Sequence, residues 1–225
     1  MFLLLITSYK YSMKVYFLPI TNTNWERHDT ELLHYLSEYR KNKVLAYRYD
    51  IDKKLCLYAA LLVRMKLILL TGIPNNKLNF SFLSTKKPVF LSNSLYHFNF
   101  SHTRNAILCG ISYSNNIGVD IENINTAPFE IIDSTFHSDE KNYVISSKSP
   151  DIAFYEIWTQ KEAYMKYKGV GLNDDLTLVN TKHPKLLPYF LTWKNGNYIC
   201  SIFSDDISSV NIETINEKQI IQFFL

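Results

Sequence analysis

The chain has 225 residues, of which 47% are hydrophobic and 20% charged, and its formal net charge is +3. This composition is typical of a folded globular protein and excludes a disordered tail, a collagen-like fibre and a disulfide-dense miniprotein. So small a positive charge does not indicate a nucleic-acid-binding protein. The aromatic content of 15%, with 16 Tyr and 14 Phe, predicts a core built around rings.

The cysteines and the N-terminus bear on where the protein works. The three cysteines are scattered and lack the spacing of zinc ligands: Cys56, Cys109 and Cys200. They are expected to be buried thiols in a reducing cytosol, so a cytoplasmic protein is predicted. The apolar run at residues 1–6 is too short to cross a membrane and lacks a basic flank. Residues 1–12 could be a start-site extension, and the choice between Met1 and Met13 as the start stays open.

The first half of the chain is expected to contain strands on either side of two helices. The longest helix is interrupted by Arg64 and Lys66, which favours an amphipathic core helix over a membrane span. Gly72 and Pro74 are expected to end it. In chain order, the predicted elements are a strand at 14–18, helices at 25–39 and 50–70, and strands at 97–101, 106–113 and 117–122.

The second half is expected to contain helices followed by an antiparallel sheet. Gly169 should end a long helix, and residues 194–197 have the Asn-Gly pair of a hairpin turn. The predicted elements are helices at 128–143 and 151–168 and strands at 177–180, 189–193, 198–203, 210–215 and 219–224. The chain is therefore predicted to be α+β, with helices on a small antiparallel sheet in each of two subdomains, 1–116 and 117–225.

Three short motifs could carry chemistry. In the strand 118–122, Asp120 and Glu122 lie on one face, because alternate residues of a strand share a face. Two carboxylates about 7 Å apart at their Cα atoms can converge on a hard cation such as Mg²⁺. Glu162 and Lys166 are four residues apart and share a helix face. Taken alone, the first motif is better explained as a solvated acidic strand and the second as an exposed ion pair.

The third motif is the run of residues 98–102, which ends in Ser101 and His102. Adjacent strand residues point to opposite faces, so these two side chains do not form a nucleophile and its base. A hydroxyl and an imidazole at the end of a strand suit phosphate oxygens better. The alternative is a structural histidine.

In this order and at these distances, the motifs resemble those of the Sfp-type 4'-phosphopantetheinyl transferases. The family pattern is phenylalanine–asparagine–apolar–serine–histidine, then glycine–apolar–aspartate–apolar–glutamate, then tryptophan–x–x–lysine–glutamate followed by a lysine. Here these stand at residues 98–102, 118–122 and 158–166, and the tail at 168–172 also matches. The resemblance can be followed from Lys14 to Leu172 and implies the family's pseudo-dimer, two similar α+β halves with coenzyme A in the cleft between them.

The resemblance implies an enzyme that moves the phosphopantetheine arm of coenzyme A onto a serine of an apo acyl- or peptidyl-carrier protein, releasing adenosine 3',5'-bisphosphate. The site residues it implies are Asp120, Glu122 and Glu162 for Mg²⁺, Lys161 and Lys166 for the pyrophosphate, and Ser101 and His102 for phosphate. The general base would be Glu162, or a carboxylate acting through a metal-bound water. Glu140 is a second candidate for the base, and the sequence does not decide between them.

In the first half, the resemblance implies nucleotide contacts. Arg40 and Lys43 match a basic pair that approaches the 3'-phosphate, although they could equally be solvated charges, and Lys87 lies in the family's lysine–proline turn. The sequence departs from the family at residues 55–56, where Leu-Cys replaces a phosphate-binding pair, and at Lys86, which replaces a glycine. The effect of Leu-Cys on coenzyme A affinity stays open, with the lysines at 53 and 54 as possible compensation.

The partners follow from the same resemblance: coenzyme A and a carrier protein, no nucleic acid, no membrane, and a monomer, because one chain carries both halves of the cleft. The carrier and the pathway it serves cannot be read from the sequence. Two other functions remain, a Mg²⁺-dependent hydrolase of the coenzyme A pyrophosphate and a non-catalytic module that binds coenzyme A or a carrier. A requirement for an apo-carrier protein would separate the transferase from the hydrolase.

Overall fold

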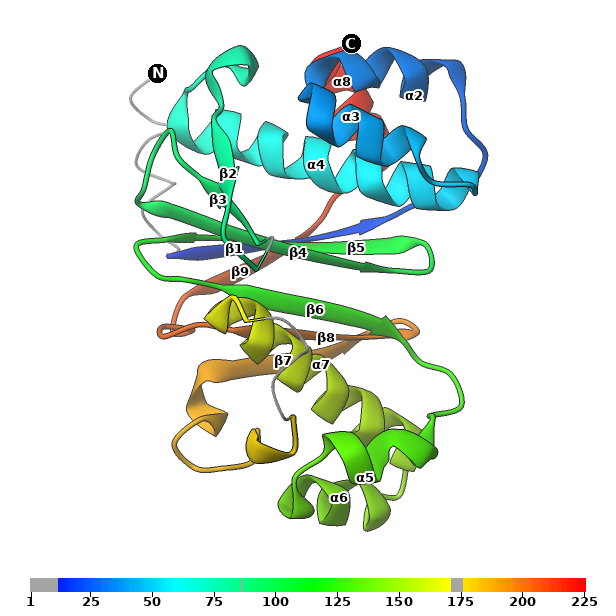
Figure 1. The fold of residues 1–225 in the computed structure, drawn as a ribbon, viewed down its shortest axis with the longest axis vertical. Helices are drawn as coiled ribbons and strands as arrows, with labels where there is room; N and C mark the ends of the chain where they lie inside the picture. The colour runs from blue at the N-terminus through cyan, green and yellow to red at the C-terminus, as the bar shows by residue number, and fades with distance from the viewer. Residues whose placement is uncertain (1–11, 86, 171–175) are drawn as a thin grey trace.

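The computed structural model describes residues 12–85, 87–170 and 176–225. The question of the start site, the substitution at Lys86 and the end of the motif at 168–172 lie outside the described residues. Figure 1 shows four layers in the order helices, sheet, sheet, helices. The upper sheet has the strand order β4-β5-β1-β9, the lower sheet has the order β6-β8-β7, and β2 and β3 form a separate pair.

The elements of the first half are β1 (Met13–Pro19), α2 (Arg27–Leu32), η1 (Leu33–Tyr35), α3 (Glu38–Leu45), α4 (Asp50–Thr71), η2 (Asn75–Lys77), β2 (Phe80–Phe82), β3 (Pro88–Phe90), β4 (Tyr96–Thr103) and β5 (Ala106–Tyr113). Those of the second half are β6 (Gly118–Asn123), η3 (Phe129–Ile131), α5 (Ile132–Thr135), α6 (Ser138–Ile145), α7 (Pro150–Lys168), η4 (Leu176–Leu178), η5 (Leu187–Tyr189), β7 (Phe190–Asn195), β8 (Tyr198–Phe203), β9 (Val210–Thr214) and α8 (Glu217–Phe224). The prefix η marks short 3₁₀ helices.

The two long helices begin and end where their sequences indicate. α4 ends at Gly72, whose φ of 70° is the left-handed conformation that glycine adopts without strain. α7 has Pro150 at its first position and ends at Gly169, with a φ of 69°. The helices predicted at 50–70 and 151–168 are therefore confirmed. None of the helices among the described residues is long and apolar enough to span a membrane.

The core has a layer on each side of the upper sheet and two smaller clusters where α7 packs on the lower sheet. Between this sheet and the helices above it, α4 buries an apolar face against β1, β4 and β5. Between the two sheets, apolar side chains from β1 and β5 pack against those of β6 and β8; among them are Val15, Leu108, Val119, Ile121 and Ile202. Burial of this second layer fixes β6 against the upper sheet and so brings the motif strands 98–102 and 118–122 together.

The two halves repeat the same order of elements. Each contains a strand, a short helical segment, an eight-residue helix, a long helix and then an antiparallel hairpin. α3 with α4 corresponds to α6 with α7, and the hairpin β4–β5 corresponds to β7–β8. The α+β class with helices on small sheets in two similar halves is thus confirmed, although the sequence has no detectable repeat.

The C-terminal segment returns to the first half. The antiparallel strand predicted at 210–215 is wrong in its pairing, because β9 lies parallel to β1 at the edge of the upper sheet. The strand predicted at 219–224 is wrong too, since α8 occupies this range, packs against α2 and α4 and buries Ile220 and Phe224 in the core. Ile220 and Phe224 are four residues apart, which is a helical spacing. The strand predicted at 177–180 is also wrong, because these residues form η4 and a turn.

Candidate active site

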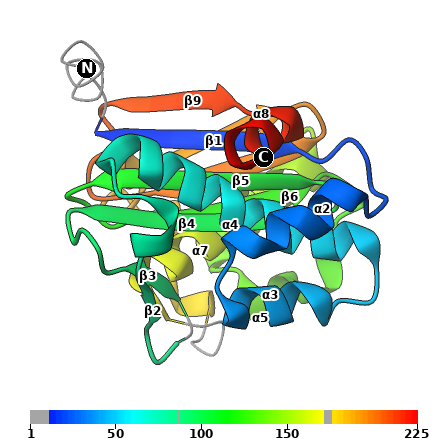
Figure 2. The same ribbon diagram turned by 90° about the horizontal axis from the view of Figure 1, so that it is seen from above.

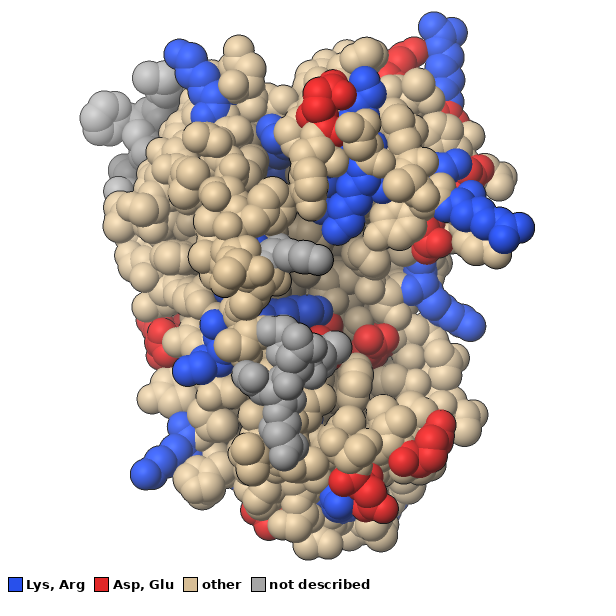
Figure 3. Space-filling model, viewed as in Figure 1, with Lys and Arg blue, Asp and Glu red and all other residues tan. Residues whose placement is uncertain are grey.

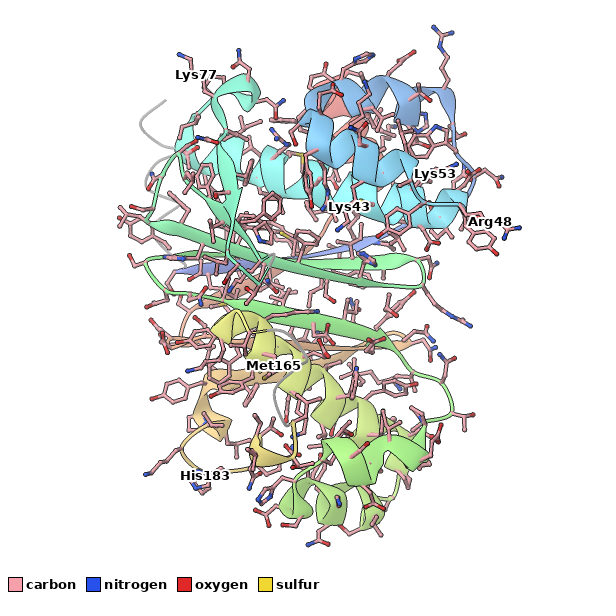
Figure 4. All side chains as sticks on the ribbon, in the orientation of Figure 1. Lys43, Arg48, Lys53, Lys77, Met165 and His183 are labelled. Carbon is pink, nitrogen blue, oxygen red and sulfur yellow. The ribbon has the colours of Figure 1, made fainter. Side chains whose placement is uncertain are left out.

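The site lies where β4 passes β6 and where α7 crosses β6. The amide of Val119 donates a hydrogen bond of 3.0 Å to Asn99 Oδ1, which joins the two strands. Gly118 allows the close approach of α7, because a Cβ at this position would lie 1.9 Å from the carbonyl oxygen of Ala163. Figure 4 shows α7 running beneath β6, with Met165 labelled on the helix. The three motifs of the sequence therefore meet at one point.

At this point Lys166 contacts the other two motifs. Its Nζ donates to Asp120 Oδ1 at 2.6 Å and to Ser101 Oγ at 2.8 Å. Ser101 in turn donates to Asp120 Oδ1 at 2.7 Å. Asp120 is only 2% exposed, so this triangle of contacts is shielded from solvent on the Asp120 side. One residue from each motif takes part.

Two more carboxylates lie around Asp120. Glu122 accepts a hydrogen bond of 3.0 Å from Thr103 Oγ1, and Glu162 Oε2 lies 4.0 Å from Lys166 Nζ. Burial and the charge of Asp120 raise the pKa of Glu122 to about 7, against partial opposition from Thr103 and Lys166. Burial and Asp120 also raise the pKa of Glu162, while Lys166 lowers it. Such mutual repulsion is what a bound cation would relieve.

The chemistry of these residues fits a divalent cation. Three carboxylates are the oxygen ligands that Mg²⁺ prefers, and Asp120 Oδ2 is buried and accepts no hydrogen bond from the described residues. The carboxylate oxygens of Asp120, Glu122 and Glu162 are not all within 4.8 Å of one another. Among the described residues, the group that meets this distance is Glu26, His28 and Asp29, at the start of α2. There Asp29 caps the helix and accepts a hydrogen bond from Tyr58, so that group has a structural explanation.

The strand β4 presents different residues on its two faces. Asn99, Ser101 and Thr103 contact β6, while Phe98 lies in the core beneath α4. His102 is exposed on β4, and its pKa is lowered by partial desolvation and then by the charges of Lys166 and Arg40. Neighbouring residues of this strand thus point to opposite faces, as expected for the serine–histidine pair. The sequence analysis missed Asn99 and Thr103, although their alternate spacing with Ser101 was a readable signal.

The basic pair on α3 lies beside a pocket. Arg40 donates to the carbonyl oxygen of Cys56 at 3.2 Å, and its guanidinium lies 5.3 Å from the centroid of the Phe100 ring. Figure 4 places Lys43 on the side of α3 that faces the sheets, and Figure 3 shows basic and acidic side chains around a hollow between the two halves. The pocket has a volume of about 320 Å³, and its lining includes Arg40, Arg64, Phe80, Phe98, Phe100 and Pro88.

The Leu-Cys pair at residues 55–56, where the sequence departs from the family pattern, is buried. Leu55 and Cys56 are 2% and 3% exposed and belong to the core, so neither side chain can contact a ligand on the surface. Lys54 does not compensate, because its ammonium is buried against Asp29 and Glu217.

Lys87 joins the two halves of the molecule. Its Nζ donates to Asn116 Oδ1 at 3.1 Å and to the carbonyl oxygen of Tyr167, at the end of α7, at 3.2 Å. Burial lowers the pKa of Lys87 to about 8. The lysine–proline turn of the first half is thus anchored on the helix that carries Glu162 and Lys166.

Glu140, the second candidate for the base, and Lys161, the second lysine expected at the pyrophosphate, contact each other. They form a buried ion pair of 2.7 Å, with side chains 0% and 1% exposed. Both oxygens of Glu140 also accept hydrogen bonds, one from the amide of His137 and one from Thr181. Lys161 donates to the carbonyl oxygens of Leu176 and Val179 as well. These contacts direct the ammonium of Lys161 toward α6 and the segment 176–179.

Comparison with known proteins agrees with this site. The family model of the 4'-phosphopantetheinyl transferase superfamily matches residues 116–219. The chain is 30% identical over 188 residues to the 4'-phosphopantetheinyl transferase gsp of Aneurinibacillus migulanus, which covers 75% of this chain and 77% of that protein. It is 24% identical over 163 residues to the 4'-phosphopantetheinyl transferase Sfp of Bacillus subtilis (strain 168), covering 72% of each. HetI of Nostoc sp. (strain PCC 7120 / SAG 25.82 / UTEX 2576), also a 4'-phosphopantetheinyl transferase, is 31% identical over 109 residues, 45% of this chain and 46% of that protein. With its three motifs gathered at one point, the chain belongs to the 4'-phosphopantetheinyl transferase family.

Proposed function

We propose that this enzyme transfers the 4'-phosphopantetheine arm of coenzyme A to a serine of an apo acyl- or peptidyl-carrier protein at the site around Asp120, leaving adenosine 3',5'-bisphosphate. The observation that carries the proposal is the triangle of contacts among Ser101, Asp120 and Lys166, which unites the three motifs. The same triangle supports the assignment of the site within the family.

We assign Asp120, Glu122 and Glu162 as the residues that would hold Mg²⁺. When bound, the ion would stabilise the negative charge that develops on the phosphate oxygens during attack by the serine. The ammonium of Lys166 and the hydroxyl of Ser101 would bind the pyrophosphate oxygens from the β4 side. Buried carboxylates that repel one another support this assignment, as does Asp120 Oδ2, which accepts no hydrogen bond from any described residue.

For the general base we favour Glu162. Its side chain is 14% exposed and therefore reachable, and burial together with Asp120 raises its pKa, which makes it a stronger base. Glu140 is the weaker candidate, because both of its oxygens already accept hydrogen bonds inside the protein. We propose that Glu140 and Lys161 instead position the segment 176–181.

We assign the first half to the nucleotide end of coenzyme A. Arg40 lines the pocket beneath α3, and its Nε is buried with no hydrogen-bond partner among the described residues. The pocket walls include Phe80, Phe98 and Phe100, whose rings suit a purine. Arg40 and Lys43 would then meet the 3'-phosphate, and His102 would lie between this end and the pyrophosphate. Lys87 would act by holding its turn against α7.

The finer statements about partners remain proposals. We expect a monomer in the cytoplasm, with Mg²⁺ as the metal and with no nucleic-acid partner. Carrier proteins are typically acidic helical bundles, which would suit the positive net charge of this chain. Neither hydrolysis of coenzyme A nor a purely binding role is favoured, because the relatives reported above are all 4'-phosphopantetheinyl transferases.

The experiment that tests the proposal measures adenosine 3',5'-bisphosphate released from coenzyme A in the presence of Mg²⁺, with and without an apo-carrier protein. Release that requires the apo-carrier, and that stops when its serine is replaced by alanine, is the expected result. Release at the same rate without any carrier would contradict the proposal and support the hydrolase.

A further inference from the structure

Lys166 occupies the position that a cation bound to Asp120 would need. Its Nζ is 2.6 Å from Asp120 Oδ1 and 4.0 Å from Glu162 Oε2, so one ammonium lies between two of the three proposed metal ligands. The side chain is 29% exposed. Asp120 therefore already has a positively charged partner before any ligand binds.

The same contacts engage the groups proposed to bind phosphate. Ser101 has one hydroxyl hydrogen, and it is donated to Asp120 Oδ1. Ser101 Oγ also accepts from Lys166. In this arrangement Ser101 and Lys166 both face Asp120 Oδ1. The Ser101 hydroxyl can donate to the pyrophosphate only after it leaves Asp120, and a metal beside Asp120 would meet the charge of Lys166.

We infer that Lys166 is an internal counter-ion that moves from Asp120 to the pyrophosphate when coenzyme A binds. This inference rests on the metal and pyrophosphate site proposed above. A lysine has a flexible four-carbon stem, so its ammonium can change partners without movement of α7. Before coenzyme A binds, the ammonium competes with the metal for Asp120 and repels it.

Two consequences distinguish this exchange from a fixed phosphate-binding lysine. Metal binding without coenzyme A is weakened by Lys166, so removal of the ammonium strengthens it. Coenzyme A and the metal also favour each other's binding, because the pyrophosphate draws Lys166 away from Asp120. Such coupling is reciprocal and commonly amounts to about 5- to 150-fold in affinity.

The test is a calorimetric titration of Mg²⁺ into the protein without coenzyme A, for the wild type and for Lys166→Met, Lys166→Arg and Lys168→Met. Lys168 is the matched control, because it is exposed on the same turn of α7 and its loss removes the same charge. We expect Lys166→Met to bind Mg²⁺ at least about fivefold more tightly than the wild type. Lys166→Arg, which keeps a cation, and Lys168→Met should remain near the wild type.

A second titration follows coenzyme A with and without Mg²⁺. The dissociation constant of coenzyme A without Mg²⁺, divided by the one with Mg²⁺, should be smaller in Lys166→Met than in the wild type. If Lys166→Met binds Mg²⁺ as tightly as the wild type or more weakly, the exchange is overturned, while the metal site itself stands. Failure of both the wild type and Lys166→Met to bind Mg²⁺, with and without coenzyme A, would instead contradict the metal site itself. Lys166→Arg retains the buried ion pair, so comparison with it shows whether a change in Lys166→Met arises from lost charge or from lost folding.

Discussion

The two halves of the molecule share a scaffold but carry different chemistry. α3 with α4 and α6 with α7 follow the same order, and each half contains a fully buried lysine paired with a carboxylate. In the first half this pair is Lys54 with Asp29, and in the second it is Lys161 with Glu140. The carboxylates proposed for the metal belong to the second half alone, on β6 and α7. The features that both halves share therefore maintain the fold. The features that occur in just one half identify the site.

The largest effect should come from a residue without a counterpart in the first half. Asp120→Asn keeps the size of the side chain but removes the charge that Lys166 contacts and that the metal would need. Loss of several kcal/mol of electrostatic stabilisation corresponds to a decrease of about a thousandfold in the transfer rate. The measurement is the initial rate of carrier modification, with circular dichroism as the control for folding. A folded Asp120→Asn protein with a wild-type rate would contradict the assignment of the site to the second half.

The buried lysine of each half, Lys54 or Lys161, should stabilise the fold. Lys161→Met leaves Glu140 buried without its partner, and Lys54→Met does the same to Asp29; each should lower the free energy of unfolding by about 3–5 kcal/mol. Denaturant unfolding would measure this, and the double variant Lys161→Met/Glu140→Gln should recover part of the loss. If Lys161→Met were as stable as the wild type but inactive, Lys161 would belong to the site, as the resemblance implies, and the likeness of the two halves would fail.

The nucleotide pocket should respond more weakly than the metal site. Arg40→Gln removes one charge-assisted contact to a phosphate, so the KM for coenzyme A should rise about tenfold with little change in kcat. Arg48, which is exposed beyond the end of α3, offers the matched control Arg48→Gln. An equal fall in kcat for Arg40→Gln with an unchanged KM would move Arg40 from the nucleotide end to the reacting centre.

The last effect is a pH dependence that is specific to the second half. Burial raises the pKa of Glu122 from 4.5 in an unperturbed chain to about 7, so the folded protein holds this proton more tightly than the unfolded chain does. The metal-free protein should therefore lose stability as the pH rises from about 4.5 to 7, by about 3 kcal/mol from this group. Thermal unfolding in the presence of a chelator should show a shallower loss in Glu122→Gln than in the wild type. If the wild type and Glu122→Gln lost stability equally as the pH rises, Glu122 would be ionised over this whole pH range.

The sequence allowed prediction of those parts of the site that depend on local geometry. The alternation of a strand placed Asp120 and Glu122 together, and helical spacing placed Glu162 near Lys166, because both periods are fixed by the backbone. That Lys166 and Ser101 meet Asp120 depends on the packing of β4, β6 and α7, which no local period reveals. The resemblance to the family, rather than the spacing, suggested that the three motifs belong to one site.

Some features of the structure depend on distant segments and could not be predicted. Glu140 and Lys161 each match family positions, but their burial and their pairing depend on the loop at 176–181, which lies far away in the sequence. The antiparallel pairing predicted for the strand at 210–215 is wrong because a strand can pair with any free edge, and its own residues do not specify β1 as the neighbour. Ile220 and Phe224 did carry a helical signal, and it was read as a strand.

The most direct test of the account is the intact mass of an apo-carrier protein after incubation with this enzyme, coenzyme A and Mg²⁺. The account predicts a gain equal to one phosphopantetheine arm, which is lost when a chelator is added and lost again with Asp120→Asn. A gain that persists in full with the chelator or with Asp120→Asn would contradict the metal site. No gain on any of several carrier classes by an enzyme that binds coenzyme A would contradict the transfer itself.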